Sequence, residues 1–158
     1  MTVKKRIVHT KEKPKPKVPR YRPGRRESGK MSGFEEKVDR SLAMRGVPYE
    51  YETEFLPYVK PPVPAKKGTY NPDFVLTTER GTKVYIEAKG QFDKKDRDKT
   101  LWVLEANPGI DLRLLFQRNN PIRKGSRTTY GSWCDKHGIK WSVSSTGFVP
   151  ESWVRGDE

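Results

Sequence analysis

Two short stretches near the middle of the chain, residues 70–76 and 84–89, are apolar and β-branched enough to form strands. The polar segment between them contains one glycine, which predicts a hairpin turn. Side chains of a strand alternate between its two faces, so Glu87 and Lys89 share one face of the second strand. If the two strands pair, Asp73 at the start of the first lies close to both of these side chains.

Upstream of this hairpin, residues 32–46 predict an amphipathic helix. Ser32 and Glu35 have the spacing of a capping box, in which each side chain satisfies a backbone N–H of the other residue. Apolar residues then recur at every fourth position, and a glycine followed by a proline ends the helix. The role of reciprocal cap is a sufficient structural explanation for Glu35. A role as an acidic metal ligand supplied from a helix explains this residue equally well.

The segment between this helix and the hairpin has two parts. Residues 47–56 alternate strictly, with Glu50, Glu52 and Glu54 on one face, which predicts a strand with one solvated side. Glu50 lies closest to the helix and is the functional candidate among the three. Residues 57–69 contain four prolines, which favour a stiff, extended connector rather than a sheet strand. A connector that cannot fold back favours the exchange of segments between two protomers.

Downstream of the hairpin, helical and strand patterns alternate, so the fold class is predicted to be mixed α/β (α+β). We expect a helix over 96–107, a strand over 112–116, a short helix over 130–137, a strand over 139–143 and a final helical turn over 150–154. The loop 121–129 is basic and is a candidate contact for DNA phosphate.

Positive charge is concentrated at one end of the chain. Of the 158 residues, those at 1–31 include twelve Lys or Arg against two Glu, whereas the remainder holds 21 against 18. Repeated Lys-Pro steps oppose helix and strand alike, so residues 1–31 predict an arm that is disordered until it binds a polyanion. Nucleic acid is the favoured partner, and a solubilising tail is the alternative.

Several protein classes do not fit this composition. No apolar run approaches the about 20 residues that a membrane helix needs, so no membrane partner is expected. The single cysteine excludes an internal disulfide and fits a reducing compartment. One cysteine and two histidines are too few for a zinc site.

The trio of Asp73, Glu87 and Lys89 has a specific chemical meaning. Two carboxylates beside a lysine suit Mg²⁺, which prefers oxygen ligands and keeps waters for a substrate phosphate. The lysine can orient a water or stabilise charge on the phosphate. This spacing is the pattern of the PD-(D/E)xK nucleases, and a surface ion pair on a hairpin is the alternative explanation.

Further motifs extend the pattern over most of the chain. They lie at 32–38, 49–52, 57–59, 70–74, 87–90, 96–97, 124–126 and 130–140. Together they resemble the phage endonuclease I family, the Holliday-junction-resolving endonucleases of short-tailed lytic phages. The connector is longer than in this family, and a basic arm at the start of the chain stands in for the family's basic C-terminal tail.

The resemblance implies a restriction-endonuclease-like PD-(D/E)xK core, with a mixed sheet flanked by helices, in a segment-exchanged homodimer. It also implies cleavage of branched DNA, including four-way junctions, with Mg²⁺ or Mn²⁺, in the cytoplasm of the infected bacterial host. The arm would be 1–31 and the nuclease domain 32–158, with 57–69 connecting the exchanged segments. A non-catalytic DNA-binding protein and a duplex endonuclease without branch preference are the alternatives.

Matched position by position, the resemblance also implies roles for individual residues. The metal ligands would be Glu35, Asp73, Glu87 and the carbonyl of Ala88; Lys89 would be the catalytic lysine, and Glu50 matches a further acidic position. The candidate DNA contacts are the basic residues Lys15, Lys17, Arg20, Arg22, Arg25, Arg26, Lys94, Lys95, Arg123, Lys124 and Arg127.

Overall fold

The structure, a computed structural model, describes residues 31–60 and 66–157. Residues 1–30 of the predicted basic arm lie outside this range, and so do Lys15, Lys17 and the four arginines predicted to bind DNA there.

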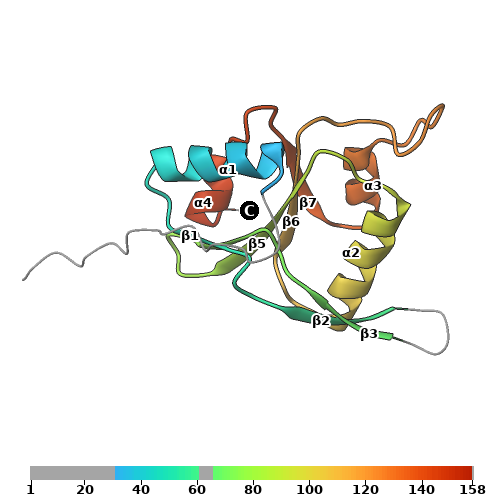
Figure 1. Cartoon of the computed structure of the whole chain (residues 1–158), viewed down its shortest axis with the longest axis horizontal. Coiled ribbons are helices and arrows are strands. Elements are labelled where there is room, and N and C mark those ends of the chain that lie inside the picture. Colours follow the sequence, from blue (N-terminus) through green and yellow to red (C-terminus); the bar gives the residue numbers. More distant parts are fainter. Residues whose placement is uncertain (1–30, 61–65, 158) are drawn as a thin grey trace, which may run out of the picture.

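A five-stranded mixed sheet forms the centre of the described chain (Figure 1). Its strands are β1 (Tyr49–Tyr51), β4 (Phe74–Thr77), β5 (Lys83–Lys89), β6 (Leu112–Phe116) and β7 (Lys140–Val143), which lie side by side in this order. The pairs β1–β4 and β4–β5 are antiparallel, whereas β5–β6 and β6–β7 are parallel. The mixed α/β prediction, with a mixed sheet flanked by helices, is confirmed.

Helices cover both faces of this sheet. On one side lie α1 (Gly33–Met44) and α4 (Glu151–Arg155), and on the other lie α2 (Lys94–Ala106) and α3 (Tyr130–Lys136) (Figure 1). Side chains of α1 and α4 pack with Ile86 and Ala88 of β5. Side chains of α2 and α3 pack with Leu114 and Phe116 of β6 on the opposite face. Both faces of β5 are therefore covered, and its polar residues lie at the boundary of a core.

The predicted capping box starts α1. Ser32 accepts a hydrogen bond from the Glu35 N–H, and Glu35 accepts one from the Ser32 N–H. The apolar stripe of Phe34, Val38 and Leu42 is buried, as the four-residue spacing predicts. The N-terminal turn of α1, which carries Glu35, is thereby fixed against the sheet.

The predicted strand over 47–56 is wrong in its length. Strand β1 ends at Tyr51, because Glu52 adopts a positive φ of 51° that breaks the extended backbone. Phe55, expected on the buried face, is 66% exposed. The bend at Glu52 directs the chain away from the sheet and into the connector.

The connector folds back, contrary to prediction. Strands β2 (Leu56–Lys60) and β3 (Lys66–Tyr70) form an antiparallel pair in which Leu56 lies opposite Tyr70. Three of the four prolines fall within 61–65, outside the described residues, and the fourth, Pro57, lies in a two-stranded sheet where every strand is an edge strand. The segments before and after the connector pack together in one chain, since β1 pairs with β4. Exchange between protomers stays a prediction.

Candidate active site

The predicted trio meets where β4 begins and β5 ends. Phe74 lies opposite Ile86, so Asp73 and Glu87 occupy the next step of the same antiparallel pair. Lys89 follows on the same face of β5 as Glu87. The hairpin pattern alone predicts this proximity, and the structure confirms it.

Asp73 is a buried carboxylate held by backbone groups. The residue is only 8% exposed, and the Oδ2 atom of its side chain accepts a hydrogen bond of 2.8 Å from the Ala88 N–H. Its own carbonyl accepts a hydrogen bond of 3.0 Å from the Glu52 N–H at the end of β1. Burial raises the pKa of Asp73 well above its usual range, and the charges of Glu87 and Glu35 raise it further.

Glu87 is equally buried, and each of its oxygens has a different partner. The residue is 6% exposed. Oε2 accepts a hydrogen bond of 2.5 Å from the Tyr70 hydroxyl, and Oε1 lies 2.8 Å from the Lys89 Nζ. Burial, together with the charge of Glu87, raises the pKa of Tyr70 well above its usual value, so this hydroxyl stays protonated and acts as a donor at neutral pH.

Lys89 lies between two acidic groups. Its Nζ is 2.8 Å from Glu87 and 3.3 Å from the Oδ1 of Asp96. Burial alone would lower the pKa of Lys89, but the charges of Glu87 and Asp96 outweigh it, and the pKa lies above its usual value. The ammonium group therefore stays charged and can donate hydrogen bonds.

Glu35 approaches the same site from α1. In addition to its capping bond, its Oε2 accepts a hydrogen bond of 2.6 Å from the Tyr51 hydroxyl. The negative charge of Glu35 adds to burial and to the charge of Glu87 in raising the pKa of Asp73. The capping role of Glu35 is confirmed, and its role as a metal ligand stays a prediction.

Glu50 is not brought into this cluster. It is exposed on β1 and accepts a hydrogen bond of 2.8 Å from the Thr53 hydroxyl. Within residues 31–60 and 66–157 it forms no hydrogen bond or ion pair with Asp73, Glu87 or Lys89.

The predicted basic contacts in the described part of the chain are exposed side chains on two segments. Lys94 and Lys95 lie at the start of α2, where Lys94 pairs with Asp98 at 2.6 Å. Arg123, Lys124 and Arg127 lie in the loop between β6 and α3. One shallow hollow is lined by residues 91–93, which follow Lys89 closely, and by Arg123 and Lys124, so the two basic segments border the same surface.

The donor set of this site can be compared with what a divalent cation requires. Among the described residues, no three Asp, Glu, His or Cys side chains already form a metal-binding group. Tyr70 and Lys89 contact the two oxygens of Glu87. The two carboxylates are nevertheless oxygen donors of the kind that Mg²⁺ prefers, and a cation between them would relieve the repulsion felt by Asp73. These residues therefore fit the predicted metal.

Two neighbours of the site, Tyr70 and Asp96, were missed as functional candidates in the sequence. Asp96 belongs to a second capping box with Asp93, which starts α2 at Lys94, two residues earlier than predicted. The spacing of Asp93 and Asp96 was a usable signal for this cap, although not for the contact with Lys89. Tyr70 lies within the motif that contains Asp73, but its contact with Glu87 depends on how β3 packs.

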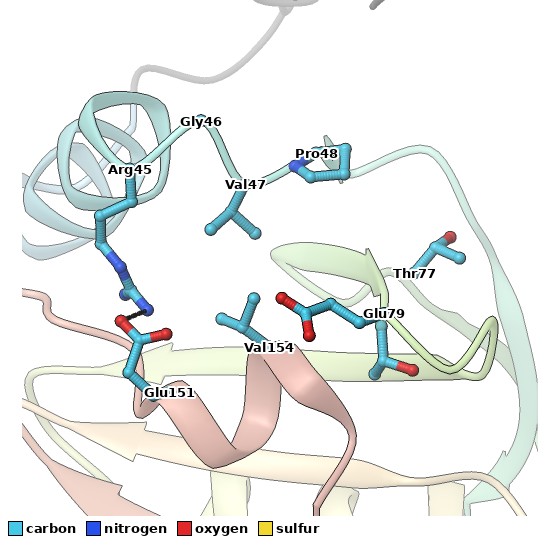
Figure 2. A pocket seen from close by; sticks show the side chains of 9 residues that line it. Arg45, Gly46, Val47, Pro48, Thr77, Glu79, Glu151 and Val154 are labelled. Atoms are coloured by element: carbon cyan, nitrogen blue, oxygen red, sulfur yellow. Dashed lines mark hydrogen bonds and ion pairs between the residues drawn. The ribbon is translucent and has the colours of Figure 1, made fainter.

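A separate hollow lies near the other end of α1. The residues that line it are Arg45, Gly46, Val47, Pro48, Thr77, Thr78, Glu79, Glu151 and Val154 (Figure 2). Arg45 and Glu151 are paired across it at 2.6 Å. Ten residues of helix separate Glu35 from Arg45, or about 15 Å at the usual rise per residue. None of the predicted site residues lines this hollow.

Comparison with known proteins identifies the family of this chain. A sequence profile described as "Phage endonuclease I" matches residues 20–158, so the protein is a nuclease. "Endonuclease I" of Escherichia phage T7 is 38% identical over 125 residues, which cover 78% of this chain and 77% of that protein. "Endodeoxyribonuclease 1" of Enterobacteria phage T3 is 41% identical over 109 residues, which cover 68% of this chain and 67% of that protein. The chain belongs to the phage endonuclease I family, and the predicted resemblance is confirmed.

No helix within residues 31–60 and 66–157 is both long enough and apolar enough to cross a bilayer.

Proposed function

We propose that this protein is a Mg²⁺-dependent endodeoxyribonuclease that cuts branched DNA, including four-way junctions, in the cytoplasm of an infected bacterium. The convergence of Asp73, Glu87 and Lys89 where β4 begins and β5 ends carries the proposal. The names of the two phage relatives support an endonuclease that acts on DNA. Carboxylates on paired central strands, with a lysine two residues on, also support the restriction-endonuclease-like PD-(D/E)xK core.

Asp73 and Glu87 would hold the cation, with the carbonyl of Ala88 assisting and Glu35 completing the ligand set from α1. Bound there, Mg²⁺ or Mn²⁺ would supply Lewis-acid activation of the scissile phosphate and of an attacking water. Burial raises the pKa of Asp73, and the negative charges of Glu87 and Glu35 raise it further; a cation bound between these carboxylates would offset that repulsion.

Lys89 has a role that follows from its charge. An ammonium that stays protonated donates hydrogen bonds, so Lys89 would stabilise the charge that develops on the phosphate oxygens or orient the water. The new P–O bond comes from water, and the bond to the 3′ oxygen breaks, which leaves 5′-phosphate and 3′-hydroxyl ends. Asp96 offers Lys89 a second partner when Glu87 is engaged elsewhere.

DNA would be held by charge on both sides of the site. Arg123 and Lys124 line the hollow together with residues 91–93, the exposed Lys94 and Lys95 follow directly in α2, and the exposed Arg127 lies in the same loop as Arg123. The arm 1–31 would add further phosphate contacts, each of which strengthens binding at low salt.

We propose in addition that the working form is a homodimer with exchanged segments. The described residues 31–60, which include α1, β1 and Glu35, meet the rest of the domain through contacts that an identical chain could make instead. In an exchanged dimer, β2 of one chain would pair with β3 of the other, so the same contacts would form between the two chains. Each active site would then take Glu35 from one chain and Asp73 from the other.

The decisive experiment compares a four-way junction with a linear duplex of the same sequence. Wild type is expected to cut the junction faster, with Mg²⁺ and not with EDTA, while Lys89→Ala binds the junction without cutting it. Equal rates on both DNAs would identify a duplex endonuclease without branch preference. Binding without cleavage in any metal would identify a non-catalytic DNA-binding protein.

A further inference from the structure

The hydroxyl of Tyr70 makes a buried contact with the candidate active site. Tyr70 is the last residue of β3 and is only 4% exposed. Its ring packs with Val103 of α2 and Leu112 of β6, and the Nζ of Lys99 lies 4.9 Å from the ring centroid. The ring therefore has little freedom, and its hydroxyl points at Glu87 Oε2 from 2.5 Å.

The two partners of Glu87 differ in how easily they can leave. Lys89 is a flexible side chain, 23% exposed, with Asp96 available as an alternative partner. Tyr70 is buried and has no comparable freedom. A charge-assisted hydrogen bond of this kind is among the stronger contacts of a buried carboxylate. Oε2 is thus fixed, while Oε1 is the oxygen that can change its partner.

We propose that Tyr70 is a positioning residue for DNA cleavage, whose hydroxyl fixes Glu87 so that its other oxygen faces the metal ion. This inference rests on the proposed function of the site. With Oε2 held by the Tyr70 hydroxyl, Oε1 would be the oxygen available to a bound cation. Lys89 would keep Asp96 as a partner and could donate to the substrate phosphate.

The same contact joins the active site to the β2–β3 hairpin. Tyr70 lies opposite Leu56, and the hairpin is held on α2 by stacking of Tyr58 on Trp102 and by a bond of 2.8 Å from the Asn107 amide to the Pro57 carbonyl. The position of the Tyr70 hydroxyl is therefore set by the hairpin as a whole.

Tyr70→Phe tests the inference because it removes the hydroxyl and keeps the ring that fills the core. Tyr85→Phe is the matched control: Tyr85 also donates to a glutamate, Glu54, at 2.9 Å, outside the proposed site. Three quantities are measured for wild type and both variants. They are the affinity for Mn²⁺ by calorimetry, the rise of the thermal midpoint on adding Mn²⁺ to the EDTA-treated protein, and the single-turnover rate of junction cleavage at saturating metal.

Removing an outer hydrogen bond to a metal ligand typically costs about 10- to 100-fold in metal affinity or activity. We expect Tyr70→Phe to lose that much in Mn²⁺ affinity or in rate, with a smaller metal-induced rise of the midpoint and unchanged junction binding in Ca²⁺. Tyr85→Phe should match wild type. The metal-induced rise is measured against each variant's own metal-free midpoint, so a general loss of stability does not imitate the effect.

If Tyr70→Phe binds Mn²⁺ and cuts within about twofold of wild type, Tyr70 is only a packing residue and the inference is overturned. The proposed function would survive that result, because wild type would still cut the junction. If instead wild type binds Mn²⁺ but cuts no DNA, the proposed function fails, and the Mn²⁺ affinities alone still decide the role of Tyr70.

Discussion

Replacing Asp73 by Asn should abolish cleavage and yet make the metal-free protein more stable. The carboxylate is buried, and burial together with the charges of Glu87 and Glu35 raises its pKa well above the usual range. An Asn side chain keeps an oxygen for the bond from the Ala88 N–H, which is 2.8 Å long with Asp73. The substitution therefore removes repulsion and desolvation without removing the hydrogen bond.

The sign of the pH dependence follows from the direction of the shift. The pKa of Asp73 in the folded protein lies above its unfolded value near 3.8. Between these two values the folded state binds the proton more tightly, so stability in EDTA falls as pH rises through that window. Above the folded pKa the full penalty is present. Asp73→Asn lacks this titration, so its advantage over wild type should grow as pH rises through that window and should vanish in acid.

Removing the repulsion and the buried charge should raise the free energy of unfolding of the metal-free protein by about 1 kcal/mol, within the range of common stabilising substitutions. For a domain of this size it raises the thermal midpoint by about 2–4 °C. Metal should reverse the order, because ligand at ten times its dissociation constant stabilises wild type by about 1.4 kcal/mol and the variant far less. The cleavage rate should fall about a thousandfold or more, as expected when a group that stabilises the transition state is removed.

Thermal unfolding in EDTA and in Mn²⁺, at neutral and mildly acidic pH, measures all of these effects except the rate. Asp111→Asn is the matched control, because pairing with Arg113 lowers the pKa of Asp111 and the same change should destabilise the protein. If Asp73→Asn is less stable than wild type in EDTA at neutral pH, the carboxylate is not a repelled charge, and the electrostatic case for a metal between Asp73 and Glu87 fails.

Three further predictions concern the chemistry, the arm and the dimer. Lys89→Ala and Glu87→Ala should each lower the cleavage rate about a thousandfold while still binding junctions, because chemistry depends on this constellation and binding on many phosphate contacts. Deleting residues 1–31 should weaken binding and flatten its salt dependence, by about 0.9 in the slope of log affinity against log salt for each phosphate that the arm neutralises, without changing the rate at saturating enzyme. A heterodimer of one Glu35→Ala chain and one Asp73→Ala chain, prepared with two tags, should nick one strand of a junction, because exchange gathers both lesions in one site and leaves the other intact.

Each of these has a clear contrary result. A rate within about tenfold of wild type for either alanine variant would remove Lys89 or Glu87 from the site. An unchanged salt slope after the deletion would make the arm a tail without a role in binding. A heterodimer that binds junctions but is as inactive as both parent homodimers would exclude the sharing of Glu35.

Much of the site could be predicted from local spacing. The hairpin pattern places Asp73 beside Glu87 and Lys89, because two-residue periodicity and antiparallel pairing leave few alternatives. The cap of α1 by Glu35 follows from a three-residue spacing in the same way. The connector was predicted wrongly, since proline content restricts the backbone but does not say where the chain turns.

The sequence by itself determined which side chains share a strand face or a helix turn, because those relations depend on backbone periodicity alone. Only the tertiary structure decided how deeply they are buried and what they meet. Helix α2 covers the face that carries Glu87, the hairpin brings Tyr70 to its carboxylate, and α1 brings Glu35 near Asp73. Burial and the choice of partners depend on segments far apart in the chain, so the spacing of residues within one strand or helix does not predict them.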